Sequence, residues 1–390
     1  MIRQYFKLLW KKRKQNAFLI LQFILVFWVI FATFSYGIVK VRSYRTPLGF
    51  EWKDVYRVNL NWDRSQDSLV LKNNIFSLKK ELESFPEISA VSYSGYIAPY
   101  LGSMWMNGGQ NEEESISFQT HFLSGDEDYA RVWGIRIKEG RFFTKEDKEG
   151  KYFPMVVNEK FVRDFMKGKP PVGFIFNYMG REARITGVVE NFKYQGDFSD
   201  ESPFTFVPVR KWDESRMLNF KVAKGTGPDI QKKVSDLVES VTKNSDFEIV
   251  KVEEQRAFRN NLTLIPLGIL GFLALFLIMN IILGLFGILR YNIARRIPEI
   301  GLRKAVGATS GAIRRQFTGE MMALTFVAFL IAVIFAVQIP FVTPLPIEKG
   351  AYFTGIGLGA LLIFGLVYLC TLAPSQQAAQ TLPARALHEE

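Results

Sequence analysis

Cysteine and histidine are almost absent from this sequence, which holds one cysteine and two histidines among 390 residues. Cys370 lies in an apolar run, so the polar part of the chain must fold without disulfides. His121 and His388 are too few to build a His/Cys zinc site with it. A Ser-His-Asp triad would have to use His121, and no serine stands in a G-x-S-x-G motif. These absences argue against an enzyme of either kind.

A phosphate-binding G-x-x-x-x-G-K-[ST] motif is also missing. We therefore expect no P-loop ATPase activity, no catalytic residues, no metal and no cofactor in this chain. The acidic run Asp126-Glu127-Asp128 could be read as a site for a hard cation. We favour a solvated turn in which Asp128 caps a helix at Tyr129–Trp133. The Gly-rich stretch Met104–Gln110 is most simply a loop.

Long apolar runs, by contrast, are plentiful. Four of them reach the length that crosses a bilayer, roughly 20 residues at 1.5 Å each. They lie at about 17–39, 263–289, 321–340 and 351–373. The first is too long for the apolar part of a signal peptide and has no small-x-small cleavage site, so we read it as a retained anchor.

The interiors of these four runs carry no charge. Their isolated amides, Gln22, Asn280 and Gln338, are expected to bond to neighbouring helices. Because ionisable residues mark ion routes through membranes, four helices without them argue against a hydrophilic solute crossing through this chain.

The net charge of +11 reflects how the chain is oriented across the membrane. Residues 1–16, expected as a basic N-terminal helix, carry six basic residues and no acid, and residues 290–320 carry seven basic and two acidic residues. The positive-inside rule places both segments and the tail at 374–390 in the cytoplasm, with residues 40–262 and a short loop at 341–350 outside. The rest of the chain is nearly neutral, so we expect no nucleic-acid partner.

The outer region is large enough to bury its own core and has mixed α/β patterns. A first β-α-β pattern consists of a strand at 55–60, a helix at about 73–85 and a strand at 88–93. A second consists of 219–223, 228–242 and 247–252. The stretch between them, about 117–198, is richer in strands and turns. We therefore predict a domain split at about 40–116 and 199–262, with an inserted β-rich part at about 117–198.

The basic loop at 290–320 carries the most specific pattern. Pro298 and Glu299 are suited to start a short helix, and Gly307 to end it in a left-handed conformation. Thr309 or Ser310 would then cap the next helix.

This short helix has two possible roles. It could be a basic elbow that binds the head groups of anionic membrane lipids. Its small residues favour docking to another protein, because they let a partner's backbone approach closely. They are Gly301, Ala305, Gly307 and Ala308.

At these residues the chain closely resembles the FtsX-like permeases of the MacB-type ABC transporter superfamily. Their inner loop reads E-x-G-x-x-[RK]-A-[VIL]-G-A, followed by a run similar to Q-F-x-x-E. The matching residues are Glu299, Gly301, Lys304, Ala305, Gly307, Ala308, Gln316, Phe317 and Glu320. The outer region is similar to the MacB-type core over Tyr129–Gly134, Lys138–Phe143, Val156–Glu159, Pro171–Gly173 and Arg184–Val189, and Pro383–Leu387 resembles the usual ending.

The resemblance implies a multi-pass permease of the inner (cytoplasmic) membrane, with four transmembrane α-helices and a large mixed α/β extracytoplasmic domain. Its split part would be porter-like. The protein would form a dimer with a second copy or a related permease. ATP and Mg would be bound by a separate ABC ATPase subunit, and the short helix would be the coupling helix that docks to it. The implied coupling residues are Pro298, Glu299, Gly301, Lys304, Ala305, Gly307 and Ala308.

In such proteins ATP hydrolysis moves the outer domains, which implies mechanotransmission for efflux of peptides, antibiotics or other periplasmic substrates. A periplasmic adaptor and an outer-membrane channel would then be further partners. The alternatives are an FtsX-like transmembrane regulator of a cell-wall hydrolase and a lipoprotein-releasing permease. Most residues before Ser117 match no substrate-specific pattern, so the substrate stays open.

Overall fold

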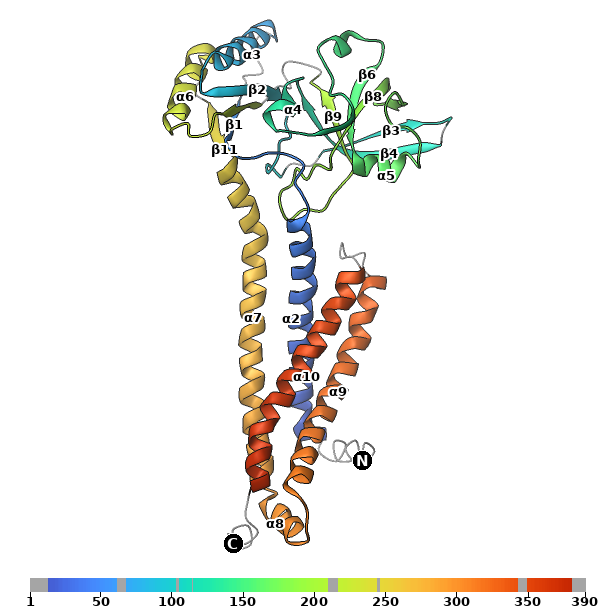
Figure 1. Ribbon diagram of the computed structural model, residues 1–390, viewed down its shortest axis with the longest axis vertical. Coiled ribbons are helices and arrows are strands. Elements are labelled where there is room, and N and C mark those ends of the chain that lie inside the picture. The colour runs from blue at the N-terminus through green and yellow to red at the C-terminus, as the bar shows by residue number, and fades with distance from the viewer. Residues whose placement is uncertain are drawn as a thin grey trace. The chain divides into compact units, whose positions relative to one another are not determined.

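The computed structural model describes residues 13–61, 68–102, 105–113, 115–209, 217–243, 246–342 and 349–380. The chain forms two compact units (Figure 1). The membrane unit comprises Met1–Arg42 and Leu264–Glu390, and the outer unit comprises Ser43–Thr263. The predictions for residues 1–12, for His388 and for the tail from residue 381 lie outside the described residues.

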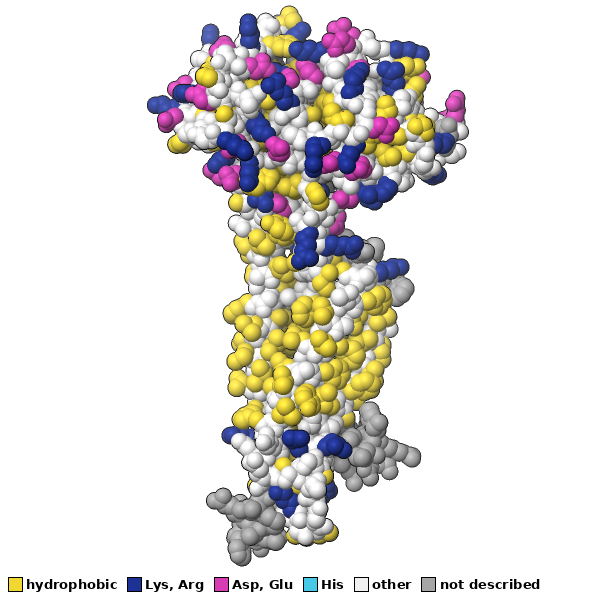
Figure 2. All heavy atoms as spheres, in the orientation of Figure 1, with side chains coloured by type: hydrophobic (Ala, Val, Ile, Leu, Met, Phe, Trp, Pro, Cys, Tyr) yellow, Lys and Arg dark blue, Asp and Glu magenta, His cyan; other side chains and the backbone are white. Residues whose placement is uncertain are grey.

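Four long helices confirm the predicted spans by length and apolar composition. They are α2 (Arg13–Arg45), α7 (Val252–Ala294), α9 (Ser310–Val342) and α10 (Lys349–Gln380). Each exceeds its predicted apolar run, because helical hydrogen bonding continues past the point where the sequence stops being apolar. Figure 2 shows hydrophobic side chains over these helices and Lys and Arg side chains where the apolar band ends.

The spans pack through aromatic contacts and close helix approach. Phe31 of α2 meets Tyr352 of α10 edge to face, with ring centroids 4.9 Å apart. A Cβ added at Gly355 would lie 2.1 Å from the Ser35 hydroxyl oxygen, so glycine is needed where these two helices meet. The amide of Asn280 donates to the Phe276 carbonyl of its own helix, 3.0 Å away. The prediction that Asn280 bonds to a neighbouring helix is therefore wrong, because its own backbone offers a nearer acceptor.

The two predicted β-α-β units form one four-stranded antiparallel layer in the outer unit. The first is β1 (Val55–Leu60), α3 (Ser68–Glu83) and β2 (Ile88–Ser94). The second is β10 (Met217–Val222), α6 (Asp229–Thr242) and β11 (Phe247–Lys251). The strand order β11-β1-β10-β2 interleaves them as a split βαβ fold of ferredoxin-like type. Buried residues on α3 and α6, among them Leu78 and Val234, form its core with the sheet.

The chain between β2 and β10 closes into a six-stranded barrel. Its strands are β3 (Met106–Asn111), β4 (Ile116–Gly125), β6 (Phe153–Asn158), β7 (Ile175–Tyr178), β8 (Arg181–Val189) and β9 (Phe204–Pro208). Pairing of β4 with β9 completes the ring β4-β3-β7-β8-β6-β9, and β5 (Ile137–Gly140) pairs with β8. Beside these lie the short helices α4 (Tyr129–Val132), η1 (Glu146–Glu149) and α5 (Glu159–Phe165). Both β3 and β9 belong to the barrel, although they lie outside the range 117–198 that the sequence predicted for the inserted part.

The Gly-rich stretch is a strand, not the predicted loop. Gly108 and Gly109 lie in β3 and pair with β4. A Cβ added at Gly109 would come within 2.6 Å of the Phe118 ring, so the missing side chain makes room for an aromatic residue of the barrel core. Met104 itself lies outside the described residues.

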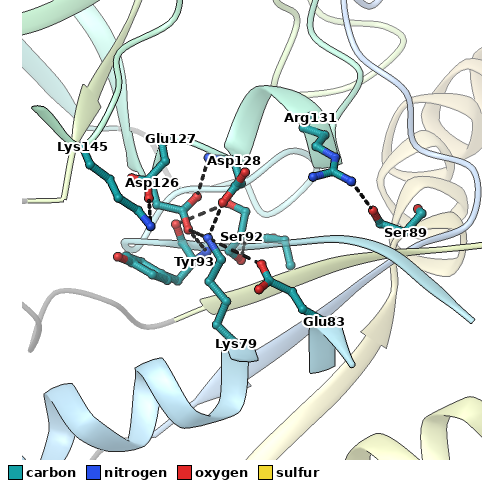
Figure 3. A network of polar contacts seen from close by, with 11 residues as sticks. Lys79, Glu83, Ser89, Ser92, Tyr93, Asp126, Glu127, Asp128, Arg131 and Lys145 are labelled. Atoms are coloured by element: carbon teal, nitrogen blue, oxygen red, sulfur yellow. Dashed lines mark hydrogen bonds and ion pairs between the residues drawn. The ribbon is translucent and has the colours of Figure 1, made fainter. Parts of the chain in front are cut away.

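The acidic run is not the solvated turn that the sequence suggested. Asp126 is fully buried, and its carboxylate lies 2.8 Å from the ammonium of Lys79 on α3 (Figure 3). The same ammonium lies 2.5 Å from Asp128, which makes no side-chain cap on α4. Burial would lower the pKa of Lys79, but the two carboxylates raise it above its usual value. This ion pair joins the ferredoxin-like layer to the end of β4, where Ser94 and Gly125 bring β2 and β4 together.

Replacing Lys79 by methionine should leave Asp126 as a buried, uncompensated charge. Removing one partner of a buried pair costs about 3–5 kcal/mol of unfolding free energy. We expect Lys79→Met to lower the unfolding temperature of the purified chain, followed by tryptophan fluorescence in detergent. Lys233→Met removes the exposed ion pair with Glu87 and should leave that temperature nearly unchanged. An equal change in unfolding temperature in the two variants would contradict the role given to Lys79.

Candidate functional site

The basic loop between α7 and α9 folds into a short helix, α8 (Ile297–Ala305), as predicted. Pro298 stands in its first turn, where its fixed φ suits the helix and its missing N–H costs nothing. Glu299 follows beside the positive end of the helix dipole. The helix therefore begins within one residue of the position that the sequence indicated.

An apolar contact on one face holds α8 in place. Ile300 is 4% exposed and packs in a cluster with residues of α9 and α10. The other members of this cluster are Ile313, Phe317, Ala378 and Ala379, with Ile293 of α7 beside them. The Ser310 hydroxyl adds a hydrogen bond to the Ala379 carbonyl, 2.9 Å away. One buried side chain thus fastens the helix to the ends of all three neighbouring helices.

Charged and amide side chains form a second set of contacts between α8 and α9. Arg303 pairs with Glu299 at 2.6 Å and donates to the Gln316 side chain at 2.7 Å. Gln316 in turn donates to Glu320, whose carboxylate is 3.0 Å from Arg296. Arg296 and Arg303 thus hold the loop together as well as making it basic.

The turn after α8 has the geometry of a Schellman motif. Gly307 has φ +98°, its N–H donates to the Lys304 carbonyl at 3.0 Å, and the Ala308 N–H donates to the Arg303 carbonyl at 2.9 Å. The Thr309 hydroxyl then accepts from the Ala312 N–H at 3.3 Å and caps α9. The predicted stop at Gly307 and the predicted cap at Thr309 are both confirmed.

The exposed face of α8 differs from the row of small residues that the sequence suggested. Gly301 is buried within the chain, whereas Ala305 and Gly307 are exposed and Ala308 is half-buried. The most prominent side chains are two apolar ones that the sequence reading missed, Leu302 at 60% and Val306 at 81% exposure.

A four-residue spacing could have identified this face. Pro298, Leu302 and Val306 follow one another at intervals of four and therefore lie along one side of a helix. Pro298 and Glu299 are exposed at the start of this row. The arrangement is a short helix that is fixed on one face by Ile300 and leaves two large apolar side chains exposed on another.

The other candidate residues assemble no reactive site. His121 is half-buried on β4, where burial lowers its pKa, and its Nδ1 has no hydrogen-bond partner. Cys370 is half-buried within α10. In the described parts of the chain, no three His, Cys, Asp or Glu side chains are grouped so that they could hold a metal.

Two family models match most of the chain. Residues 28–237 match the family of the MacB-like periplasmic core domain, and residues 271–383 match the FtsX-like permease C-terminal family.

Curated relatives are similar at low identity. An uncharacterized ABC transporter permease, YknZ of Bacillus subtilis, is 24% identical over 70% of this chain and 67% of its own length. The macrolide export ATP-binding/permease protein MacB of Sodalis glossinidius is 24% identical over 77% of this chain, which spans 48% of that relative. Among solved structures, the periplasmic region of MacB from Actinobacillus actinomycetemcomitans covers 56% of this chain and 98% of its own, with 14% identity and a TM-score of 0.39.

Replacing Gly307 should loosen α8 at its C-terminal end. Alanine at a positive φ is strained by about 1 kcal/mol, which corresponds to roughly fivefold more frequent local opening. We expect Gly307→Ala to speed hydrogen–deuterium exchange at the α8 amides. Gly311→Ala, placed in the helical first turn of α9 with open space around the new Cβ, is the matched control and should leave that exchange unchanged. Unchanged hydrogen–deuterium exchange in both variants would contradict the conclusion that Gly307 fixes this turn.

Proposed function

The chain belongs to the ABC transporter permeases that combine a MacB-like periplasmic core domain with an FtsX-like C-terminal part, and from this we propose that it converts ATP hydrolysis on a partner subunit into movement of its outer unit. In this proposal α8 is the coupling helix. ATP and Mg are bound by a separate ABC ATPase subunit, and two permease chains, identical or related, form the functional dimer. The work is done on a substrate or partner outside the cytoplasm.

The exposed apolar row on α8 is the observation that carries this proposal. Leu302 and Val306 are too exposed to stabilise the chain itself, and they stand on a helix whose opposite face is fixed by Ile300. A helix that lays apolar side chains spaced by four into a groove is a common mode of protein recognition. Two of the seven basic residues of the loop, Arg303 and Arg296, are engaged with Glu299 and Glu320, which makes these two less available to lipid head groups.

Charge supports an orientation in which α8 faces the cytoplasm. Six basic residues in segment 1–16 and seven in segment 290–320 lie on the same side of the membrane when the four spans are threaded in order. We propose that both chain ends are cytoplasmic and that the outer unit is periplasmic.

The uncharged interiors of the spans support transmission of movement over conduction. Ion and proton routes use Asp, Glu, Lys, Arg or His, and the four apolar runs contain none of these. The substrates that fit this proposal are peptides, antibiotics or other periplasmic molecules, taken onward by a periplasmic adaptor and an outer-membrane channel. Regulation of a cell-wall hydrolase and release of lipoproteins are the alternatives, and they share the same coupling step.

Capture of the chain from native membranes in mild detergent tests the coupling proposal. We expect an ABC ATPase to co-purify and to be identified by mass spectrometry. An adaptor captured with it would support efflux, and a cell-wall hydrolase would support the regulator. Absence of any ATPase would contradict the role of α8.

Placing a charge on the exposed row should weaken ATPase binding. We expect Val306→Glu, and separately Leu302→Glu, to cost at least about 2 kcal/mol of binding free energy, or roughly 30-fold in affinity. The measurement is ATPase binding to the purified permease in nanodiscs. Gly311→Glu adds the same charge to the same loop, in a helical first turn with open space, and should bind as the wild type does. Full ATPase binding by Val306→Glu would contradict docking through this row.

A further inference from the structure

The loop between β8 and β9, residues 190–203, contacts the end of α2. We call it the clamp loop. Lys193 is 1% exposed, and its ammonium donates to the carbonyls of Ser43 and Asp197 at 2.5 and 2.8 Å. Carbonyls in the last turn of a helix have no partner within the helix, and a cation there also suits the helix dipole. Lys193 therefore caps α2 from the clamp loop.

Two further contacts fasten the same helix end. The Ser43 hydroxyl donates to the Asp200 carboxylate at 2.7 Å. The rings of Tyr44 and Phe198 stack with centroids 5.3 Å apart. Two charge-assisted hydrogen bonds and one aromatic contact thus connect the last turn of α2 to this loop.

The clamp loop also holds the first turns of α7. Asp197 is 6% exposed, and its carboxylate receives two bonds from Arg256, at 2.7 Å from Nη2 and 3.0 Å from Nε. This bidentate geometry fixes direction as well as distance. Arg256 also covers the Trp52 ring at 4.1 Å, and Arg259, one turn further along α7, donates to the Gln195 carbonyl at 3.3 Å.

The loop is itself anchored in the core of the outer unit. Phe192 and Tyr194, on either side of Lys193, are 0% and 2% exposed and pack with Phe204 and Phe206 of β9. The Tyr100 N–H donates to the Tyr194 carbonyl at 2.8 Å. The clamp loop therefore connects both helix ends to the barrel strands through buried contacts.

We propose that the clamp loop is the joint that transmits movement of α2 and α7 to the outer unit, with Lys193 and Asp197 as the contacts that carry it. The two residues lie four positions apart in one loop, yet they hold helices that are more than 200 residues apart in the chain. This inference rests on the proposed function, because it assumes that the spans move when the partner hydrolyses ATP.

The test measures movement of the outer unit in the full chain with its ATPase partner, in nanodiscs. Spin labels are attached at Gly227→Cys and Gly350→Cys, two positions where an added Cβ meets open space, on a Cys370→Ala background. Labelled chain is diluted with unlabelled chain, and pulsed electron resonance measures the distance between the labels with and without ATP and vanadate.

Asp197→Asn keeps the shape of the side chain and removes its charge. We expect this variant to bind the ATPase and hydrolyse ATP as before, but to lose most of the nucleotide-dependent distance change. Exchange of the pair, Asp197→Arg with Arg256→Asp, should restore part of it. Glu201→Gln removes the more exposed ion pair of the same loop with Arg163 and should keep the full change.

The outcomes separate the two proposals. If Asp197→Asn keeps the full distance change, the clamp loop is not the transmitting joint. This holds even when the unfolding temperature of the variant falls. If the unsubstituted protein shows no nucleotide-dependent change while the ATPase is bound and active, the proposed function fails as well. A reduced change in Asp197→Asn at an unchanged unfolding temperature, restored by the exchanged pair, supports the joint, because the ion pair and not overall stability then governs the distance change.

Discussion

The need to satisfy every backbone hydrogen bond inside hydrocarbon is the constraint on which this structure depends. A helix meets that need within a single segment, and all four apolar runs are helical. In α2 and α7 the same hydrogen bonding continues as far as Arg45 and starts already at Val252. Both helices therefore run without a break from the residues of the membrane unit into those of the outer unit.

Buried charge marks the places where distant parts of the outer unit are joined. Lys79 meets Asp126 across 47 positions in the sequence. Arg57 is fully buried, which lowers its pKa to about 10, and its guanidinium donates to the Pro99 carbonyl at 3.3 Å and to Gln255 in the first turn of α7. Burying charge is costly unless it is well bonded, and these bonds are directional. They fix the relative position of elements that apolar contacts alone would hold less specifically.

The proposed coupling helix, α8, follows the opposite logic on its exposed face. Ile300 and the linked side-chain contacts that run from Glu299 to Arg296 hold one side of α8 in place. Leu302 and Val306 are therefore exposed in one fixed orientation. A pre-ordered helix loses little conformational freedom when a partner binds, which favours affinity. The same rigidity is what a coupling element needs if closure of an ATPase is to be passed to the spans.

Local patterns in the sequence indicated most of the elements and much of α8. Apolar length indicated the four spans and alternation the two β-α-β units. Pro298 and Gly307 indicated the two ends of α8, and Thr309 indicated the start of α9. Each of these signals acts through the backbone within a few residues. Long-range packing decided the rest. The sequence could not reveal that Gly109 makes room for Phe118, that Asp126 is buried against Lys79, that Gly301 faces inward, or that Lys193 and Asp197 hold two helix ends. Each of these facts depends on residues brought together by the fold, so only the tertiary structure could decide them.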